Sequence, residues 1–303
     1  MGIPESQLQV WSRQGDVAAA EATYQSIRQA FSAPTCPLQE TDFELYLHGS
    51  YRNGTNIRDD SDVDIVAQLN STFDVDDSAL SASEKDLLRS SCRREPYLWE
   101  EFRADALQAL ETCYGTSNVW ETTRSLRVAG DPERLRADIV ACLQYRKYER
   151  FRSIRDQRYA EGITFYAFKE NRWLTNFPKI HYENGVNKNS QRRTRGRYWP
   201  TVRVFKNART YLVDRGVIAE DLAPSHMLEC LLYNVPDNRF APTHQMTFLD
   251  VIAWLLESFR DDRHWRFTFQ HEQLPLFGDG PDQWVPDSAM ALLQKLLELW
   301  RDW

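Results

Sequence analysis

Two aspartates near residue 60 stand at a spacing that suits metal chemistry. In "HGSYRNGTNIRDDSDVDIVAQL", residues 48–69, Asp62 and Asp64 alternate with β-branched residues. This alternation predicts a strand, and residues two apart on a strand point the same way. Two carboxylates so close repel each other unless a cation joins them. A hard divalent ion such as Mg²⁺, which binds carboxylate and phosphate oxygens, is the natural solution.

A third carboxylate follows on another predicted strand. Asp138 lies inside the apolar pattern of "RLRADIVACLQYRKY", 74 residues after Asp64. Three acids on one face of a sheet are typical of a phosphoryl-transfer site, in which two metal ions stabilise the attacking and the leaving oxygens. Gly49 and Ser50, just upstream, predict a tight turn whose amides and hydroxyl could hold a phosphate oxygen.

Each of these signals also has a simpler interpretation. The "DSDVD" stretch could be a solvated acidic turn or a calcium-binding loop. Asp138 could be the buried ion-pair partner of Arg134 or Arg136. The three acids together favour the metal site over both alternatives.

Composition narrows the class of protein. The chain has 303 residues, of which 42% are hydrophobic and 13% aromatic, so a disordered or fibrous protein is excluded. A net charge of −7 argues against a protein whose main task is to bind long nucleic acid, because phosphate neutralisation supplies most of that affinity. The five cysteines and six histidines do not fall at zinc-ligand spacing, so we expect metal chemistry through oxygen ligands and no zinc site.

Hydrophobic periodicity predicts an α+β fold. One helix is expected before "APTCPLQ", two are expected within 84–114, and a loop is expected at "NFPKIHYENG" (176–185). Four stretches after residue 197 read as helices. The strands are expected at 43–48, 62–69, 118–127, 136–145 and 162–169.

The elements predict a bilobal chain, with ligands between the lobes. We expect an N-terminal helix over 1–35 that packs on both lobes, a strand-rich core over 36–175 and a helical lobe over 176–303. The chain has neither a secretory signal nor a membrane-spanning apolar run, so a cytoplasmic location is expected.

One segment is strongly basic against the acidic background. Residues 184–213 hold eight lysines or arginines and no acid. Arginine presents paired donors that suit phosphate oxygens, so a polyphosphate such as a nucleoside triphosphate is the predicted partner. The alternative for 192–197, "RRTRGR", is an exposed loop without a ligand.

The motif resembles that of the DNA polymerase β-like nucleotidyltransferases. The resemblance rests on Gly49-Ser50, an eleven-residue spacer, Asp62-Val63-Asp64-Ile65 and the later Asp138. His48 departs from the pattern, because an apolar residue usually precedes the glycine.

More of the chain is similar to one branch, the bacterial cGAS/DncV-like nucleotidyltransferases (CD-NTases). The similar stretches lie between residue 3 and about residue 236. Members of this branch make cyclic oligonucleotide second messengers in anti-phage defence. The stretches are "IPESQLQVWSRQG", "NFPKIHYENG", "PTVRVFKNAR" and "LECLLYNVP".

The resemblance implies roles for particular residues. The three aspartates would hold two Mg²⁺ ions, with Mn²⁺ as an alternative. Lys206 would reach the donor triphosphate, and Ser225 would contact the same group at a helix start, where anions are favoured. Lys206 could instead be a surface residue and Ser225 only a helix cap. The predicted nucleotide contacts are Gly49, Ser50, Arg203, Lys206 and Ser225.

The resulting hypothesis is a cyclic oligonucleotide synthase, most simply a cyclic dipurine dinucleotide synthase. It would use ATP, GTP or both, would release pyrophosphate, and its product would be read by a separate effector protein. The alternatives are a template-independent RNA nucleotidyltransferase and a non-catalytic nucleotide sensor. The motif spacing does not encode the bases, the linkage or the ring size.

Overall fold

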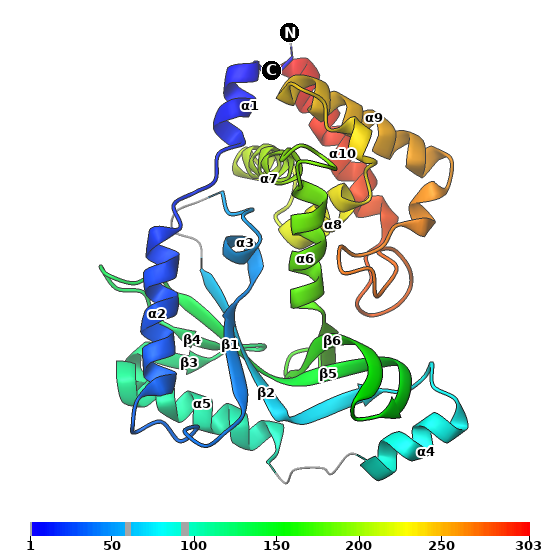
Figure 1. Cartoon of the computed structure of the whole chain (residues 1–303). Coiled ribbons are helices and arrows are strands. Elements are labelled where there is room, and N and C mark those ends of the chain that lie inside the picture. Colours follow the sequence, from blue (N-terminus) through cyan, green and yellow to red (C-terminus); the bar gives the residue numbers. More distant parts are fainter. Residues whose placement is uncertain (1, 58–61, 92–96) are drawn as a thin grey trace. The chain divides into compact units, whose positions relative to one another are not determined.

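The computed structural model describes residues 2–57, 62–91 and 97–303. The chain folds as two compact units. Unit 1 combines Met1–Gly15, Asn53–Arg58 and His181–Trp303, and unit 2 combines Asp16–Arg52 and Asp59–Ile180. The sheet lies in unit 2 and most helices lie in unit 1 (Figure 1). The predicted α+β class is therefore confirmed.

Unit 2 is built on one mixed sheet of seven strands in the described part of the chain. The strand order is β1-β2-β5-β4-β3, with β6 paired to β5 and β7 paired to β6. Only β2 and β5 run parallel, and the other pairs are antiparallel. The strands are β1 (Phe43–Leu47), β2 (Val63–Asp76), β3 (Val119–Glu121), β4 (Leu126–Val128), β5 (Ala137–Ser153), β6 (Asp156–Ala167) and β7 (Arg172–Asn176).

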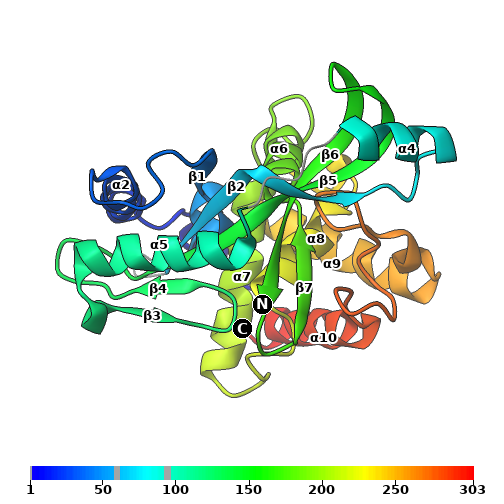
Figure 2. The same cartoon turned by 90° about the horizontal axis from the view of Figure 1, so that it is seen from below.

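Helices α2 (Ala18–Ser32) and α5 (Trp99–Tyr114) cover one face of this sheet. Figure 2 shows α5 running beside β3 and β4. The buried faces of both helices pack on Val63, Ile65 and Ala67 of β2. Because strand side chains alternate, the even-numbered residues of β2 point to the opposite face. The remaining helices of unit 2 are α3 (Gly49–Arg52) and α4 (Ala82–Ser91).

Unit 1 is a helical unit with its own apolar core. Its central helix is α7, because ten of its residues are buried. Helix α1 packs on α7 and α9, and the Glu5 carboxylate accepts hydrogen bonds from the first two amides of α9, at 2.9 Å each. The helices are α1 (Glu5–Trp11), α6 (Pro178–Asn189), α7 (Tyr198–Asp214), α8 (Ser225–Tyr233), α9 (His244–Arg260) and α10 (Pro286–Asp302), with 3₁₀ turns at Thr116–Asn118 in unit 2 and at Asp237–Arg239 and Arg263–Arg266 in unit 1.

Several predicted elements differ from the structure. The helix expected over 1–35 is two helices, α1 in unit 1 and α2 in unit 2. The strand expected at 118–127 is a hairpin of β3 and β4, and the loop expected at 176–185 is mostly helix α6. That prediction took Pro178 as a loop residue. Proline also favours the first position of a helix, and Pro178 is the first residue of α6. Strand β7 was not predicted.

No helix within the described residues is long and apolar enough to cross a membrane.

Candidate active site

The sheet brings two of the predicted acids side by side. Strands β2 and β5 pair in parallel, and in their register Asp64 lies opposite Asp138. Both side chains point to the face that α2 and α5 leave uncovered, because their neighbours Val63, Ile65 and Ile139 point into the core on the other side. Asp62 directly precedes β2. The sheet thus places the predicted acids at adjoining strands, as the sequence led us to expect.

Gly49 packs directly behind the Asp64 carboxylate. Its φ is 65°, and a Cβ atom added there would lie 2.1 Å from Asp64 Oδ2. The neighbouring His48 amide donates to the Asp64 carbonyl at 2.8 Å. The predicted turn at Gly49-Ser50 is the start of the short helix α3. Glycine is therefore required here for its backbone conformation and for the space that Asp64 occupies.

Changing Gly49 to alanine is expected to lower the turnover of the nucleotidyl transfer that the sequence motif implies by on the order of 100-fold, because the new methyl group must displace the Asp64 carboxylate. The left-handed backbone adds about 1–2 kcal/mol of strain. Gly115→Ala is the matched control, since Gly115 has a φ of 83° and no described atom lies within 4 Å of a Cβ placed there. Steady-state pyrophosphate release compares the two variants. Equal losses of turnover would show that the contact with Asp64 is unimportant.

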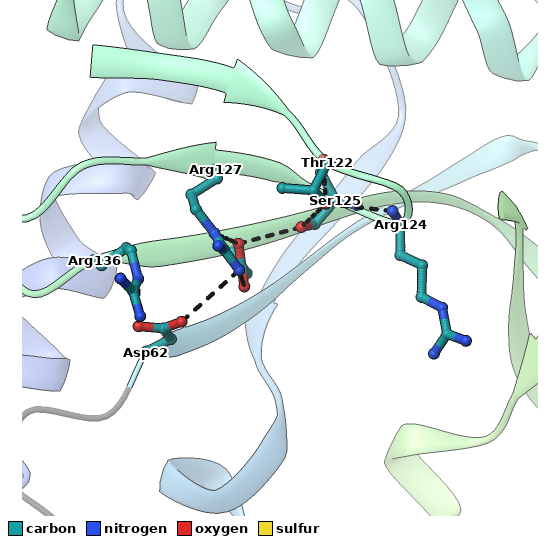
Figure 3. A network of polar contacts seen from close by, with 7 residues as sticks. Asp62, Thr122, Arg124, Ser125, Arg127 and Arg136 are labelled. Atoms are coloured by element: carbon teal, nitrogen blue, oxygen red, sulfur yellow. Dashed lines mark hydrogen bonds and ion pairs between the residues drawn. The ribbon is translucent and has the colours of Figure 1, made fainter. Parts of the chain in front are cut away.

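Arginine side chains pair with two of the three acids, Asp62 and Asp138, and Figure 3 shows Arg127 and Arg136 beside Asp62. Arg127 of β4 lies opposite Asp138 in the antiparallel register, and its Nε and Nη2 donate to the two carboxylate oxygens at 2.7 and 2.6 Å. Ser125 Oγ donates to Asp138 Oδ1 at 3.2 Å. The hydrogen bond to Asp138, with the nearby negative charges, raises the pKa of Arg127 against the opposing effect of burial.

Asp62 is paired as well. Arg136 Nε lies 2.6 Å from Asp62 Oδ1, and Arg127 Nη2 lies 3.8 Å from Asp62 Oδ2. The simpler interpretation of Asp138 named the wrong partners, because Arg134 pairs with Asp131 instead. Asp138 does form an ion pair, but with a residue on the neighbouring strand.

An open pocket of 710 Å³ adjoins Asp138. Its volume lies in the range of small-ligand sites. Trp120 and Phe168 contribute large apolar side chains that are 42% and 49% exposed, and Arg124 and Arg127 contribute charge. The lining residues are Trp120, Glu121, Thr122, Thr123, Arg124, Ser125, Arg127, Asp138 and Phe168.

The donor set of the acids fits a hard divalent ion. All three side chains offer carboxylate oxygens, which Mg²⁺ and Mn²⁺ prefer. An ion bound by Asp62 and Asp138 would have to displace the guanidinium groups that now contact them. The site is therefore chemically suited to divalent cations, in competition with its own arginines.

Lys206 and Arg203 lie in unit 1, where they hold a backbone segment. Lys206 is 6% exposed and its Nζ donates to the Thr55 carbonyl at 2.8 Å. Arg203 donates to the carbonyls of Ser12 and Gly54, and burial lowers its pKa to about 10. Lys206 is thus not the surface residue of the simpler interpretation. The predicted phosphate contacts of both residues stay predictions.

Ser225 begins α8 and is exposed. Pro224 occupies the N-cap position and Ser225 is the first helical residue, so Ser225 is not the N-cap residue of the simpler interpretation. In the basic segment, Arg193 pairs with Asp237 at 2.7 Å and Arg197 donates to the Phe240 carbonyl at 3.2 Å. Much of that positive charge therefore serves contacts within unit 1.

Sequence reasoning missed two residues of interest. Arg127 stands alternate to apolar residues in "SLRVAG", but only the β4–β5 register places it on Asp138. Glu229 is buried inside α8 at 4% exposure. A lone acid in the apolar run "MLECLLY" was a usable signal of the same kind as Asp138.

Comparisons with known proteins agree with this architecture. Residues 35–108 match the family described as "Nucleotidyltransferase domain". Residues 183–301 match "cGAS/DncV-like nucleotidyltransferase C-terminal helical domain".

Individual relatives align with most or all of the chain. The chain is 46% identical to the cyclic UMP-AMP synthase of Rhodothermus marinus, covering 100% of this chain and 99% of that protein. It is 33% identical to the cyclic dipurine nucleotide synthase of Elizabethkingia meningoseptica, covering 86% and 87%.

Solved structures give the same result. The Rhodothermus marinus CdnE c-UMP-AMP synthase with Apcpp and Upnpp superposes with a TM-score of 0.88 at 45% identity, over 99% of this chain and 97% of that chain. The Elizabethkingia meningoseptica CdnE cyclic dinucleotide synthase with GTP and Apcpp superposes with a TM-score of 0.76 at 30% identity, over 98% of both. The chain thus contains a nucleotidyltransferase domain and the matching C-terminal helical domain, and a relative aligns with it from end to end. It therefore belongs to the cGAS/DncV-like nucleotidyltransferases and is a nucleotidyltransferase enzyme.

Proposed function

We propose that this enzyme joins two nucleoside triphosphates into a cyclic dinucleotide and releases pyrophosphate. The observation that carries the proposal is the in-register placement of Asp64 and Asp138 on parallel strands, with Asp62 two residues before Asp64. The relatives that align over most of the chain are named as cyclic nucleotide synthases, which favours a cyclic product over other transfers.

The three acids have different roles in this proposal. Asp62 and Asp64 hold the donor side of the reaction, and Asp138 faces the acceptor hydroxyl and accepts its proton. Divalent ions bound by these carboxylates would supply the charge that stabilises the attacking and leaving oxygens. Arg127, released from Asp138, remains close enough to neutralise phosphate charge. The pocket beside Asp138, which Trp120 and Phe168 help to line, receives a nucleoside.

We propose a mixed product of one uridine and one adenosine nucleotide. The support is the 46% identity to the cyclic UMP-AMP synthase over the whole chain, against 33% to the cyclic dipurine synthase. The dipurine product that the family resemblance implied is the second candidate, favoured by the Elizabethkingia relative. The product would then signal to a separate effector protein in anti-phage defence.

A product assay tests both proposals. The purified enzyme is incubated with Mg²⁺ and all four labelled triphosphates, treated with phosphatase, and the surviving material is analysed by mass. A resistant dinucleotide with one uracil and one adenine is expected, and its formation should require only UTP and ATP. A product of two purines would support the second candidate instead.

Two other outcomes would replace the proposal. Long products on added RNA, with tight and salt-sensitive RNA binding, would identify a template-independent RNA nucleotidyltransferase. Triphosphate binding without pyrophosphate release would identify a nucleotide sensor.

A further inference from the structure

Unit 1 contains a cluster of soft metal ligands that the nucleotidyl-transfer proposal does not use. His181 of α6, His226 of α8 and Cys230 of α8 each offer one ligand atom, and these atoms lie within 4.8 Å of one another. Within residues 2–57, 62–91 and 97–303, this is the single group of three such side chains. It differs in chemistry from the aspartates of unit 2.

Local structure explains how the three side chains meet. His226 and Cys230 are four residues apart on one helix and so lie on one face, with Nε2 and Sγ separated by 4.0 Å. The rings of His181 and His226 have centroids 5.2 Å apart. Ligand atoms around tetrahedral zinc are about 3.5 Å apart, given bonds of roughly 2.0–2.3 Å. A side-chain shift of about 1 Å would therefore complete the geometry.

An unsatisfied nitrogen points to a missing ligand. His181 is 2% exposed, and its buried Nδ1 has no hydrogen-bond partner among the described residues. A buried polar atom in that state costs about 1–3 kcal/mol. The other ring nitrogen, Nε2, lies 3.3 Å from the Glu229 carboxylate. A carboxylate on one nitrogen and a metal on the other is the usual environment of a ligating histidine.

The surroundings hold the cluster in place. Glu229 accepts from Asn53 Nδ2 at 3.2 Å and from Thr55 Oγ1 at 3.3 Å. Gln270 Nε2 donates to the His181 carbonyl at 2.7 Å, which fixes α6. Cys230 is fully buried, whereas His226 is not buried and offers a route from solvent.

We propose that His181, His226 and Cys230 form a second metal site, which takes Zn²⁺ or a similar borderline-soft ion. Two imidazoles and a thiolate suit Zn²⁺ and Co²⁺ and reject Mg²⁺. With three protein ligands, the fourth position is left for water. The thiolate and the nearby Glu229 carboxylate balance the two charges of the ion. The metal would join α6 to α8 and stabilise unit 1, since a ligand that binds only the folded state adds to its stability.

Cobalt spectroscopy tests this site apart from catalysis. The full chain carries Asp62→Asn and Asp64→Asn, is stripped with chelator, and is titrated with Co²⁺. One equivalent should produce a thiolate-to-cobalt charge-transfer band and the visible bands of four-coordinate cobalt, and Zn²⁺ should displace it while excess Mg²⁺ does not. Zn²⁺ should also raise the thermal unfolding midpoint.

Matched variants locate the site. Cys230→Ser should abolish the charge-transfer band. His181→Ala should weaken Co²⁺ binding by at least about 100-fold, because the loss of a ligand costs more than the 10–100-fold lost with a partner of a ligand. Cys113→Ser, at an exposed cysteine, should leave the band unchanged. Circular dichroism confirms that each variant is folded, and the absence of a Zn²⁺-dependent thermal shift in folded Cys230→Ser is the expected companion result. Absence of the band in the Asp62→Asn/Asp64→Asn chain, or a band that survives the addition of Cys230→Ser to that chain, would overturn the proposal.

Discussion

Changing Asp62 and Asp64 together to asparagine is expected to reduce pyrophosphate release by on the order of 10⁴-fold, because charge stabilisation at each oxygen supplies about 10²–10³. The amide keeps the size of the carboxylate but not its negative charge, so divalent cations lose two of the three carboxylates that are proposed to bind them. The free energy of unfolding should change by about 1 kcal/mol or less, since the Asp62–Arg136 contact is partly exposed and such pairs contribute little.

Asp74→Asn provides the control for this double variant. Asp74 lies on the same strand β2 and is exposed, so the Asp74→Asn enzyme should retain full turnover. Initial rates are measured across a Mg²⁺ titration, with urea unfolding as the check on folding. Turnover by Asp62→Asn/Asp64→Asn near the level of the Asp74→Asn enzyme would refute the assignment of the acids.

Removing the buried carboxylate of Glu229 is expected to lower the free energy of unfolding more than any other substitution proposed for this protein. Its pKa is raised by burial, but the hydrogen bond from His181 and the charges of His181, Lys206 and His226 outweigh this effect and lower it. Glu229→Ala leaves His181, Asn53 and Thr55 without this acceptor and removes the negative charge near Lys206 and His226. Breaking a buried charged pair in this way costs about 3–5 kcal/mol.

Urea unfolding followed by tryptophan fluorescence measures this loss. Glu257→Ala is the matched control, because Glu257 is exposed on α9 and surface substitutions usually stay within about 0.5 kcal/mol. Glu229→Gln should fall between the two, since its amide oxygen still accepts hydrogen bonds. Equal stability of Glu229→Ala and Glu257→Ala would show that the buried network does not support unit 1.

Much of the fold follows from local patterns. Strand β2, helix α5 and the four helices after residue 197 have periodic apolar residues, so their types could be read from the sequence. The hairpin of β3 and β4 could not, because the turn depends on Thr122 and Ser125, whose side chains and backbones bond each other. Helix α6 was missed because its sequence, "PKIHYENGVNKN", has almost no apolar periodicity.

The acids of the site could be predicted, whereas their partners could not. An aspartate in an apolar strand can be recognised from the sequence, because a carboxylate inside the fold needs a polar or charged partner. Arg127 cannot be recognised in this way, because the side chain of an arginine on a short strand can equally well point into solvent. The soft cluster in unit 1 was also missed: the histidine–cysteine pair at 226 and 230 has helical spacing, but His181 lies 45 residues earlier and only the packing of α6 on α8 brings it near.

The order of the chain in the two units bears on how the enzyme is made. Unit 2 ends at Ile180, so all of its strands have been synthesised when translation reaches that residue. Unit 1 needs Met1–Gly15 as well as His181–Trp303, and α1 packs on α7 and α9. During synthesis, domains generally fold as units from the N-terminal side. On the ribosome the sheet can therefore fold first. Helix α1 can pack only after α7 and α9 have been synthesised, more than 180 residues later.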